Sequence, residues 1–327
     1  MAHKHKMSCM IACKLHISVI WICFSCLAFG QSGNGIMAVS AGYTEPRPDI
    51  LAAPGQVVTL FVSGIAGRFP QPLTATTTPW PTMLGGISIL LKQSIAPQTV
   101  AVPILAVQQF SSCPSSRSCG VFTGISIQIP FEAAPLPTAP TAPGGAILIV
   151  SEHGNTEGIV EIFTLYDNIH TLYGACDTTA RFLNKPCQWI VTHADGTLVS
   201  QSNPAKESEV LVMYAYGLGR TVPPVNTGEV TPVAAPVESG TILVGFDFKS
   251  NAEPTRVVST DGTATRPLFA GLTPGFVGLY QINFRLPSFP ARIQPCGAVI
   301  LSNLTVNIAG PRSFHGAGIC VEPTTGQ

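Results

Sequence analysis

Alternation of apolar and polar side chains is the clearest pattern along this chain. Residues 125–129 (ISIQI) and 282–286 (INFRL) alternate strictly, which is the period of a β-strand with one buried face. A β-branched and aromatic run at 57–62 (VVTLFV) has glycine-containing turns on both sides. The same signals predict strands at 146–150, 159–165, 210–215, 241–248 and 298–306. With no amphipathic helix found, the pattern predicts an all-β fold.

The alternating strands belong to an internal repeat. Residues 125–131 (ISIQIPF) align with 282–288 (INFRLPS), and each run is followed by a proline-rich turn and a glycine-led apolar stretch, 145–149 and 297–301. Upstream, 56–64 matches 208–217. A repeat of this length predicts a duplicated unit. We expect two tandem immunoglobulin-like β-sandwiches, 48–165 and 206–323, joined by a cysteine-bearing linker at 166–205.

The amino terminus has the pattern of a secretory leader. Three lysines and three histidines precede the apolar stretch 17–29 (ISVIWICFSCLAF), and Ala28 and Gly30 suit cleavage before Gln31. The apolar stretch is shorter than the roughly 20 residues that span a bilayer. We therefore expect a signal peptide at 1–30 and a flexible segment at 31–47. Export predicts a secreted or cell-surface protein whose mature part has no membrane span.

Three alternatives for the leader stay open. Val39 and Ala41 offer a second cleavage position, and an uncleaved leader would serve as a membrane anchor. A lipid anchor on Cys26 is the third, although the residues before this cysteine match a lipobox poorly.

Composition narrows the class of partner. Only 10% of the residues are charged and 46% are hydrophobic, and Gly 31 and Pro 29 indicate many turns. The formal net charge is zero, and because the leader contains Lys4, Lys6 and Lys14 and no carboxylate, the remainder is slightly acidic. A nucleic-acid partner would require a basic patch, which this chain does not offer.

Six cysteines lie beyond the leader, an even number that suggests disulfides in an exported chain. Pairing of neighbours, 113–119, 176–187 and 296–320, is the simplest of the pairings that six cysteines allow. None has the C-x₂-C spacing of a zinc site. The probable disulfide cysteines are Cys113, Cys119, Cys176, Cys187, Cys296 and Cys320.

The chain from about residue 48 to residue 321 resembles an uncharacterised C-terminal domain family of exported acidobacterial proteins. The most specific matches are 214–219 (YAYGLG) and 269–283 (FAGLTPGFVGLYQIN); shorter ones lie at 53–58, 81–88, 194–197 and 203–205. The first half departs from the family pattern, because Gly124-Ile125-Ser126 stands where a Gln-Ile-Asn is usual. The resemblance implies an exported immunoglobulin-like module and no established activity.

The long match contains the polar pair Gln281 and Asn283 and the glycines Gly275 and Gly278. Both amides share the strand face opposite Ile282, so we expect them to point away from the core. There they would hydrogen-bond loop backbone and stabilise a structural motif. The alternative is that they line a ligand groove.

No spacing in the chain indicates catalysis. There is no G-x-S-x-G elbow, no H-E-x-x-H and no recognisable triad, although carboxylates acting as a glycosidase pair stay open. Asp195-Gly196 and Asp261-Gly262 indicate hairpin turns, because a calcium loop would need further ligands in series. We expect neither an enzyme nor a cofactor or metal site.

Loop aromatics are the remaining candidates for binding. Trp80 lies between Pro79 and Pro81 and is a possible ligand contact, either on a partner or on a sugar ring, unless it folds onto the sandwich edge. Trp189 follows Cys187 and is expected to pack on a disulfide. The sequence thus favours a non-catalytic adhesion or protein-interaction module whose partner is an extracellular protein or glycan. A carbohydrate-binding protein is the alternative, and an unfamiliar hydrolase is a third hypothesis.

Overall fold

The structure is a computed structural model, and it describes residues 37–41, 50–94, 96–112, 120–136, 145–154, 156–174, 188–238, 241–258 and 264–325. Within these residues the regular secondary structure is entirely β, arranged in several sheets, as the alternating pattern predicts. Residues 31–327 belong to one unit. No helix in the described part could cross a membrane.

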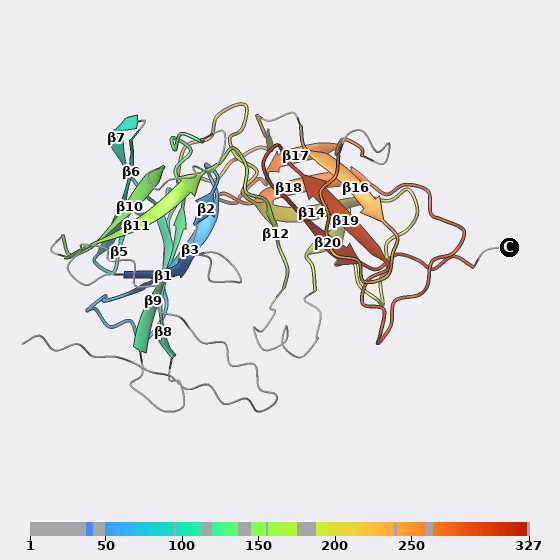
Figure 1. Ribbon diagram of the computed structural model, residues 1–327, viewed down its shortest axis with the longest axis horizontal. Helices are drawn as coiled ribbons and strands as arrows, with labels where there is room; N and C mark the ends of the chain where they lie inside the picture. The colour runs from blue at the N-terminus through green and yellow to red at the C-terminus, as the bar shows by residue number, and fades with distance from the viewer. Residues whose placement is uncertain are drawn as a thin grey trace, which may run out of the picture. The chain divides into compact units, whose positions relative to one another are not determined.

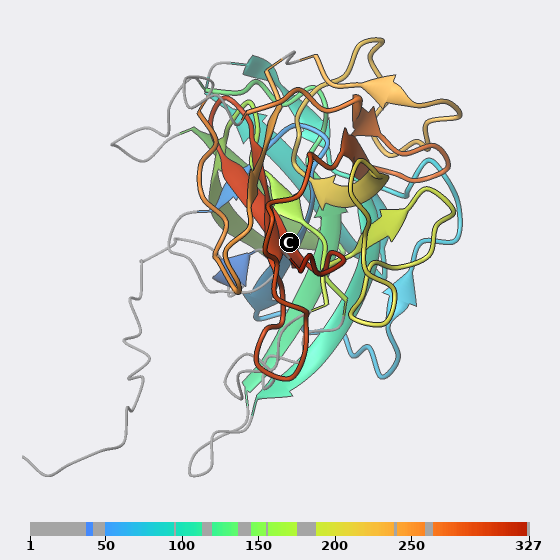
Figure 2. The same cartoon turned by 90° about the vertical axis from the view of Figure 1, so that its right-hand side faces the viewer.

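Two sheets pack face to face in the first part of the chain, here called the first sheet pair (Figure 1). One has the order β1-β3-β9-β8-β4, with bounds β1 Met37–Ala41, β3 Val57–Ser63, β9 Gly120–Gln128, β8 Ile104–Ser112 and β4 Leu73–Thr74. The other has the order β2-β11-β10-β6-β5 with β7 also on β6, and its bounds are β2 Leu51–Ala52, β11 Thr156–Thr164, β10 Ala146–Glu152, β6 Ile87–Gln93, β5 Met83–Leu84 and β7 Ala96–Ala101. Both figures show the long β8–β9 hairpin projecting from its sheet (Figures 1 and 2).

The alternating residues of these strands form the first core. Burial alternates along β10 and β6, so every second side chain faces the opposite sheet. Leu60, Ile125, Ile127 and Leu148 are fully buried there. Each such side chain stabilises the fold by about 1.5–3 kcal/mol.

The second sheet pair also consists of two sheets around one core (Figure 1). One has the order β12-β14-β18-β17-β15 with β13 also on β14, and its bounds are β12 His170–Thr171, β14 Val210–Tyr216, β18 Tyr280–Arg285, β17 Phe269–Leu272, β15 Ala235–Pro236 and β13 Val191–His193. The other has the order β16-β19-β20, with bounds β16 Leu243–Asp247, β19 Leu304–Ala309 and β20 Phe314–Ile319.

The second core contains a fully buried tyrosine. Tyr280 and Phe284 are its largest buried side chains. The Tyr280 hydroxyl donates a hydrogen bond to the carbonyl of Gly219 at 2.5 Å. Burial raises the pKa of Tyr280 well above its ordinary value, so the group stays a neutral donor.

The two sheet pairs repeat one pairing pattern. β3 pairs with β9 as β14 pairs with β18, and the hairpins β8–β9 and β10–β11 correspond to β17–β18 and β19–β20. The repeat extends to the parallel contacts, because β2 pairs with β11 and Ala205 bridges Val321 in the same orientation. The aligned stretches 56–64 and 208–217 form β3 and β14, as the alignment predicts.

Single residues repeat as well. Gly55 and Ser208 both have positive φ, 79° and 61°, just before β3 and β14. The next residue caps the same turn in both places: Oε1 of Gln56 accepts the N–H of Ala53, and a carboxylate oxygen of Glu209 accepts the N–H of Lys206, each at 2.8 Å. The turn is therefore built in the same way twice.

One expected strand is displaced. The run 298–306 was expected to be a strand, but β19 begins at Leu304. Asn303, 1% exposed, breaks the run because its side-chain amide donates to the carbonyls of Gln294 and Val321. Strand pairing therefore shows that β19, and not residues 297–301, is the strand of the second sheet pair that is equivalent to β10.

Two segments that were expected to be irregular contribute strands. Residues 37–41, within the expected flexible segment 31–47, form β1, because their backbone pairs with β3. Residues 170–171 and 191–193, within the expected linker 166–205, form β12 and β13, because both pair with β14. The signal peptide 1–30, the cysteines Cys113, Cys119, Cys176 and Cys187, and Asp261-Gly262 lie outside the described residues.

Backbone and amide groups join the two sheet pairs. Gln128 is fully buried at the end of β9, and its Oε1 accepts the N–H of Gly228 at 2.6 Å. The side-chain amide of Asn168 donates to the carbonyl of Leu51 at 2.8 Å. These groups would otherwise be buried without partners, so each contact favours the joined arrangement.

An arginine adds a second contact. Arg220 donates from Nε to the carbonyl of Phe131 at 3.0 Å and from Nη2 to that of Ala133 at 2.9 Å. The ring of Phe131 packs against the core of the second sheet pair. The contact is therefore both apolar and hydrogen-bonded.

Candidate functional site

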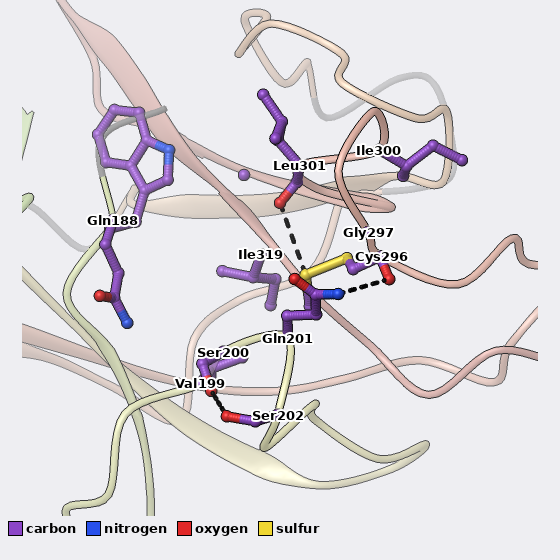
Figure 3. Close-up of a pocket in the computed structure, with 13 residues that line it drawn as sticks. Gln188, Val199, Ser200, Gln201, Ser202, Cys296, Gly297, Ile300, Leu301 and Ile319 are labelled. Atoms are coloured by element: carbon purple, nitrogen blue, oxygen red, sulfur yellow. Dashed lines mark hydrogen bonds between the residues drawn. A yellow bond between two sulfur atoms is a disulfide. The ribbon is translucent and has the colours of Figure 1, made fainter. Parts of the chain in front are cut away.

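A cavity of about 510 Å³ lies in the second sheet pair beside the disulfide Cys296–Cys320 (Figure 3). Its walls come from three stretches that are far apart in sequence, one before β14, one before β19 and one at the end of β20. The lining residues are Gln188, Trp189, Val199, Ser200, Gln201, Ser202, Cys296, Gly297, Ile300, Leu301, Gly318, Ile319 and Cys320.

Residues 296–301, here called the wall loop, form one side. The disulfide attaches the start of the loop to Cys320 at the end of β20, with the two Cα atoms 5.9 Å apart. Asn251 holds the other end: its Nδ2 donates to the carbonyl of Val299 at 2.9 Å, and its Oδ1 accepts the N–H of Leu301 at 2.7 Å. The wall loop is thus fixed without being a strand.

Residues 200–203, here called the rim loop, form the opposite side. Ser200 and Asn203 exchange backbone hydrogen bonds at 3.0 and 3.2 Å and close a tight turn. Inside the turn, the hydroxyls of Ser200 and Ser202 lie 3.2 Å apart (Figure 3). Gln201 donates from Nε2 to the carbonyl of Cys296 at 3.3 Å, so the rim loop contacts the wall loop across the cavity.

Trp189 forms the third side and belongs to an aromatic cluster. Its ring meets Tyr173 edge-on with centroids 5.4 Å apart and His315 with centroids 5.8 Å apart. Gly318 of β20 lies beside the indole: a Cβ at that position would be in ordinary contact with Nε1 of Trp189 at 3.7 Å, although it would clash with the Ser302 hydroxyl at 2.7 Å. The indole is therefore held by neighbours of the second sheet pair, and the expected packing on Cys187 lies outside the described residues.

The chemistry of the cavity is neutral. None of its described lining residues carries a charge, and the polar groups are amides, hydroxyls and backbone. Exposed apolar residues belong to the same stretches: Leu301, which lines the cavity, is 39% exposed, and Val299 and Leu198, which are sequence neighbours of lining residues, are 81% and 43% exposed. An exposed apolar group beside fixed neutral hydrogen-bonding groups is typical of a surface that binds an uncharged part of another molecule.

An ionisable pair, His193 and Glu209, contacts the rim loop at Asn203. Nδ1 of His193 lies 2.5 Å from Oε1 of Glu209, and Nε2 lies 3.2 Å from the carbonyl oxygen of Asn203. Although burial by itself lowers the pKa of His193, the bonds to Glu209 and Asn203 outweigh it, and the pKa is raised above 6.5.

The Asp195 turn is a hairpin, as expected. Oδ1 of Asp195 accepts the N–H and the hydroxyl of Thr197 at 2.9 and 2.7 Å, and Gly196 has a φ of 85°. These bonds to Thr197 lower the pKa of Asp195. Among the described residues, no group of three or more histidine, cysteine, aspartate or glutamate side chains could hold a metal ion.

Trp80, the candidate ligand contact, does not line this cavity. Its side chain is half-buried, and its backbone N–H donates to the carbonyl of Gly228 at 2.9 Å. The structure therefore places Trp80 where the first sheet pair meets the second.

The four motif residues of the 269–283 match, Gly275, Gly278, Gln281 and Asn283, do not line the cavity either. Gln281 and Asn283 are half-buried on the outer face of β18, and Nε2 of Gln281 donates to Oδ1 of Asn283 at 3.3 Å. Gly278 has a φ of 65° and packs against Gly55 of the first sheet pair, whereas Gly275, φ 81°, faces open space.

Sequence reasoning did not find the rim loop or the wall loop. Its indications there were the pairing of Cys296 with Cys320, which the structure confirms, and the short match at 203–205. Ser200, Gln201 and Ser202 have the composition of any surface turn, so nothing in the sequence distinguishes them.

No protein-family model matches this chain, and no curated protein matches it closely enough to count as a relative.

Proposed function

We propose that this chain is an exported, non-catalytic binding protein of the cell surface or extracellular space, which contacts a partner protein at the cavity beside Cys296–Cys320. The observation that carries the proposal is the wall loop, which presents Val299, 81% exposed, beside an uncharged cavity. Leu301 of the same loop is also exposed, and a partner that covered both side chains would remove their apolar surface from water.

Three features support the proposal at the level of the whole chain. The leader pattern indicates export, and the repeated pairing pattern of the two sheet pairs supports tandem immunoglobulin-like sandwiches that arose by duplication. The resemblance to the exported acidobacterial module family points the same way. Folds of this kind serve many adhesion and interaction proteins, so the site and not the fold identifies the surface.

The lining supports a non-catalytic role. General acid–base chemistry needs a titratable group within reach of the substrate, and none of the described lining residues supplies a carboxylate or an imidazole. Binding requires no such group.

Site-specific photocrosslinking tests the partner surface. A photoreactive residue is placed at Leu301 in the wall loop, and in a second variant at Leu90 on the outer face of β6; both side chains are 39% exposed. With extracellular and envelope fractions of the producing cell, we expect one distinct crosslinked protein at Leu301 that is absent at Leu90. Equal crosslinking at the two positions would show that the wall loop is no interface.

A carbohydrate ligand is the second candidate. It is favoured by Trp189 together with Gln188 and Gln201, because an aromatic ring and nearby amides are typical of sugar recognition. A glycan array tests it: specific binding that Gln201→Ala abolishes and Trp80→Ala preserves would favour a sugar at this cavity. The reverse pattern would favour Trp80, and a blank array would leave the protein partner.

A further inference from the structure

His193 lies where it can control the rim loop. Its side chain is 11% exposed, and it lies at the end of β13, between the rim loop on one side and the start of β14 on the other. Both ring nitrogens have partners: Nδ1 meets the carboxylate of Glu209 at 2.5 Å, and Nε2 meets the carbonyl oxygen of Asn203 at 3.2 Å.

Both partners of the ring are acceptors. A carboxylate and a carbonyl oxygen cannot donate, so both contacts are hydrogen bonds only when the ring carries a proton on each nitrogen. A neutral imidazole has one N–H and serves one acceptor. The carboxylate of Glu209 is the stronger acceptor, so the neutral ring keeps that bond and presents a lone pair to the oxygen of Asn203.

We propose that protonated His193 clamps the rim loop against β13, and that loss of the Nε2 proton releases it, so that binding at the cavity is controlled by pH. This inference rests on the proposed function, because it concerns the same cavity. The released segment contains Ser200, Gln201 and Ser202, all of which line the cavity.

The charges around the ring favour the clamped form. Glu209 and Asp195 both act on the ring as negative charges and raise its pKa. Lys206 donates its backbone N–H to Glu209, and its ammonium group lies 4.0 Å from the carboxylate of Glu322. Arg285 donates to the carbonyl of Ser208, next to Glu209, and so directs its charge to backbone.

Loss of the Nε2 proton releases the rim loop only in part, because other hydrogen bonds still hold it. The rim turn keeps its own backbone bonds after release but opens more often, and Nδ2 of Asn203 still donates to the hydroxyl of Thr197 and the carbonyl of Leu198 at 3.3 and 3.2 Å. Loss of one hydrogen bond of ordinary net strength, while these others persist, therefore predicts about a fivefold to tenfold loss of protection in this loop, not unfolding.

Hydrogen exchange of the mature protein tests the clamp without any ligand. Protection of the backbone amides of Ser200 and Asn203, which donate to each other's carbonyls, is measured from pH 5.5 to 8.5 and corrected for intrinsic exchange, while NMR follows the ring protons of His193. We expect protection to fall by about fivefold to tenfold at the pH where His193 titrates. Strand β10 of the first sheet pair serves as the internal reference.

Variants separate the clamp from general effects of pH. His193→Gln should give a rim loop whose protection is independent of pH, and Glu209→Gln, which keeps the imidazole but removes the charge that raises its pKa, should move the fall in protection to lower pH. His153→Gln, which removes a histidine from the first sheet pair, should behave as the wild type. A wild-type loop whose protection stays constant while His193 titrates would overturn the proposal, as would the same pH profile in His193→Gln. Failure to find any partner would leave this readout intact and count only against the proposed function.

Discussion

Alanine substitutions at Gly275 and Gly278 should distinguish the cost of backbone strain from the cost of a steric clash. Gly275 and Gly278 both have positive φ, but a Cβ on Gly275 would meet nothing within 4 Å, whereas one on Gly278 would lie 2.7 Å from the carbonyl oxygen of Gly55. We expect Gly275→Ala to cost about 1 kcal/mol of unfolding free energy from strain alone. Gly278→Ala should cost about 3 kcal/mol, because the clash adds to the strain. Urea denaturation of the two variants measures the difference, and equal costs would argue against the close packing.

The stability of the protein should depend on pH through His193. Its folded pKa is raised, so the folded state binds the proton more tightly than the unfolded chain, whose histidine pKa is about 6.5. The stabilisation is therefore fully present below the unfolded pKa and is lost as pH rises through the folded one. We expect the urea midpoint to fall between pH 6 and 9 in the wild type and to fall less in His193→Gln. Identical pH profiles would contradict this assignment.

At the scale of elements, the disulfide Cys296–Cys320 fixes a loop that no strand pairing holds. Its two cysteines are 24 residues apart in sequence, and the loop between them includes all of β19 and β20. Loop-closure entropy for this length predicts a loss of about 3.5 kcal/mol in the double variant Cys296→Ser, Cys320→Ser. Chemical denaturation measures the loss, and thiol titration of the unfolded variant checks that no other cysteine has become free. Unchanged stability would mean that Asn251 alone holds the wall loop.

Strand prediction succeeded where the apolar period was unambiguous. β9 and β18 alternate along their sequence, and β3 combines branched side chains with flanking turns, so local pattern and burial agree. β19 is buried along all six residues, and such a run has no period to mark where it starts. The break at Asn303 comes from hydrogen bonds to Gln294 and Val321, which only the folded chain brings together.

The cavity was beyond sequence reasoning for the same physical reason. The rim loop contacts the wall loop through one hydrogen bond between Gln201 and Cys296, across 95 residues. The sequence favoured Trp80 as a binding residue because it lies between two prolines in a loop. The tryptophan that lines the cavity is Trp189, which the rings of Tyr173 and His315 hold in place. Residues become a site here through long-range pairing, which leaves no local signal.

For the whole molecule, the contact between the sheet pairs predicts joint unfolding. Gln128 and Arg220 each place hydrogen bonds across the contact, and removing either one leaves buried backbone groups of the other sheet pair without partners. Calorimetry of the mature wild type should give one transition with a calorimetric to van't Hoff enthalpy ratio of about 1.

The combined variant Gln128→Ala, Arg220→Ala should separate that transition into two, because each sheet pair retains its own core. Gln93→Ala is the matched control: this glutamine is 5% exposed and its side chain bonds to Ala134 and Thr164 of the first sheet pair. It should lower the transition temperature without dividing the transition, since stability is lost but the coupling is not. If the combined variant still unfolds in one step, the hydrogen bonds are incidental and the apolar packing of Phe131 alone carries the coupling.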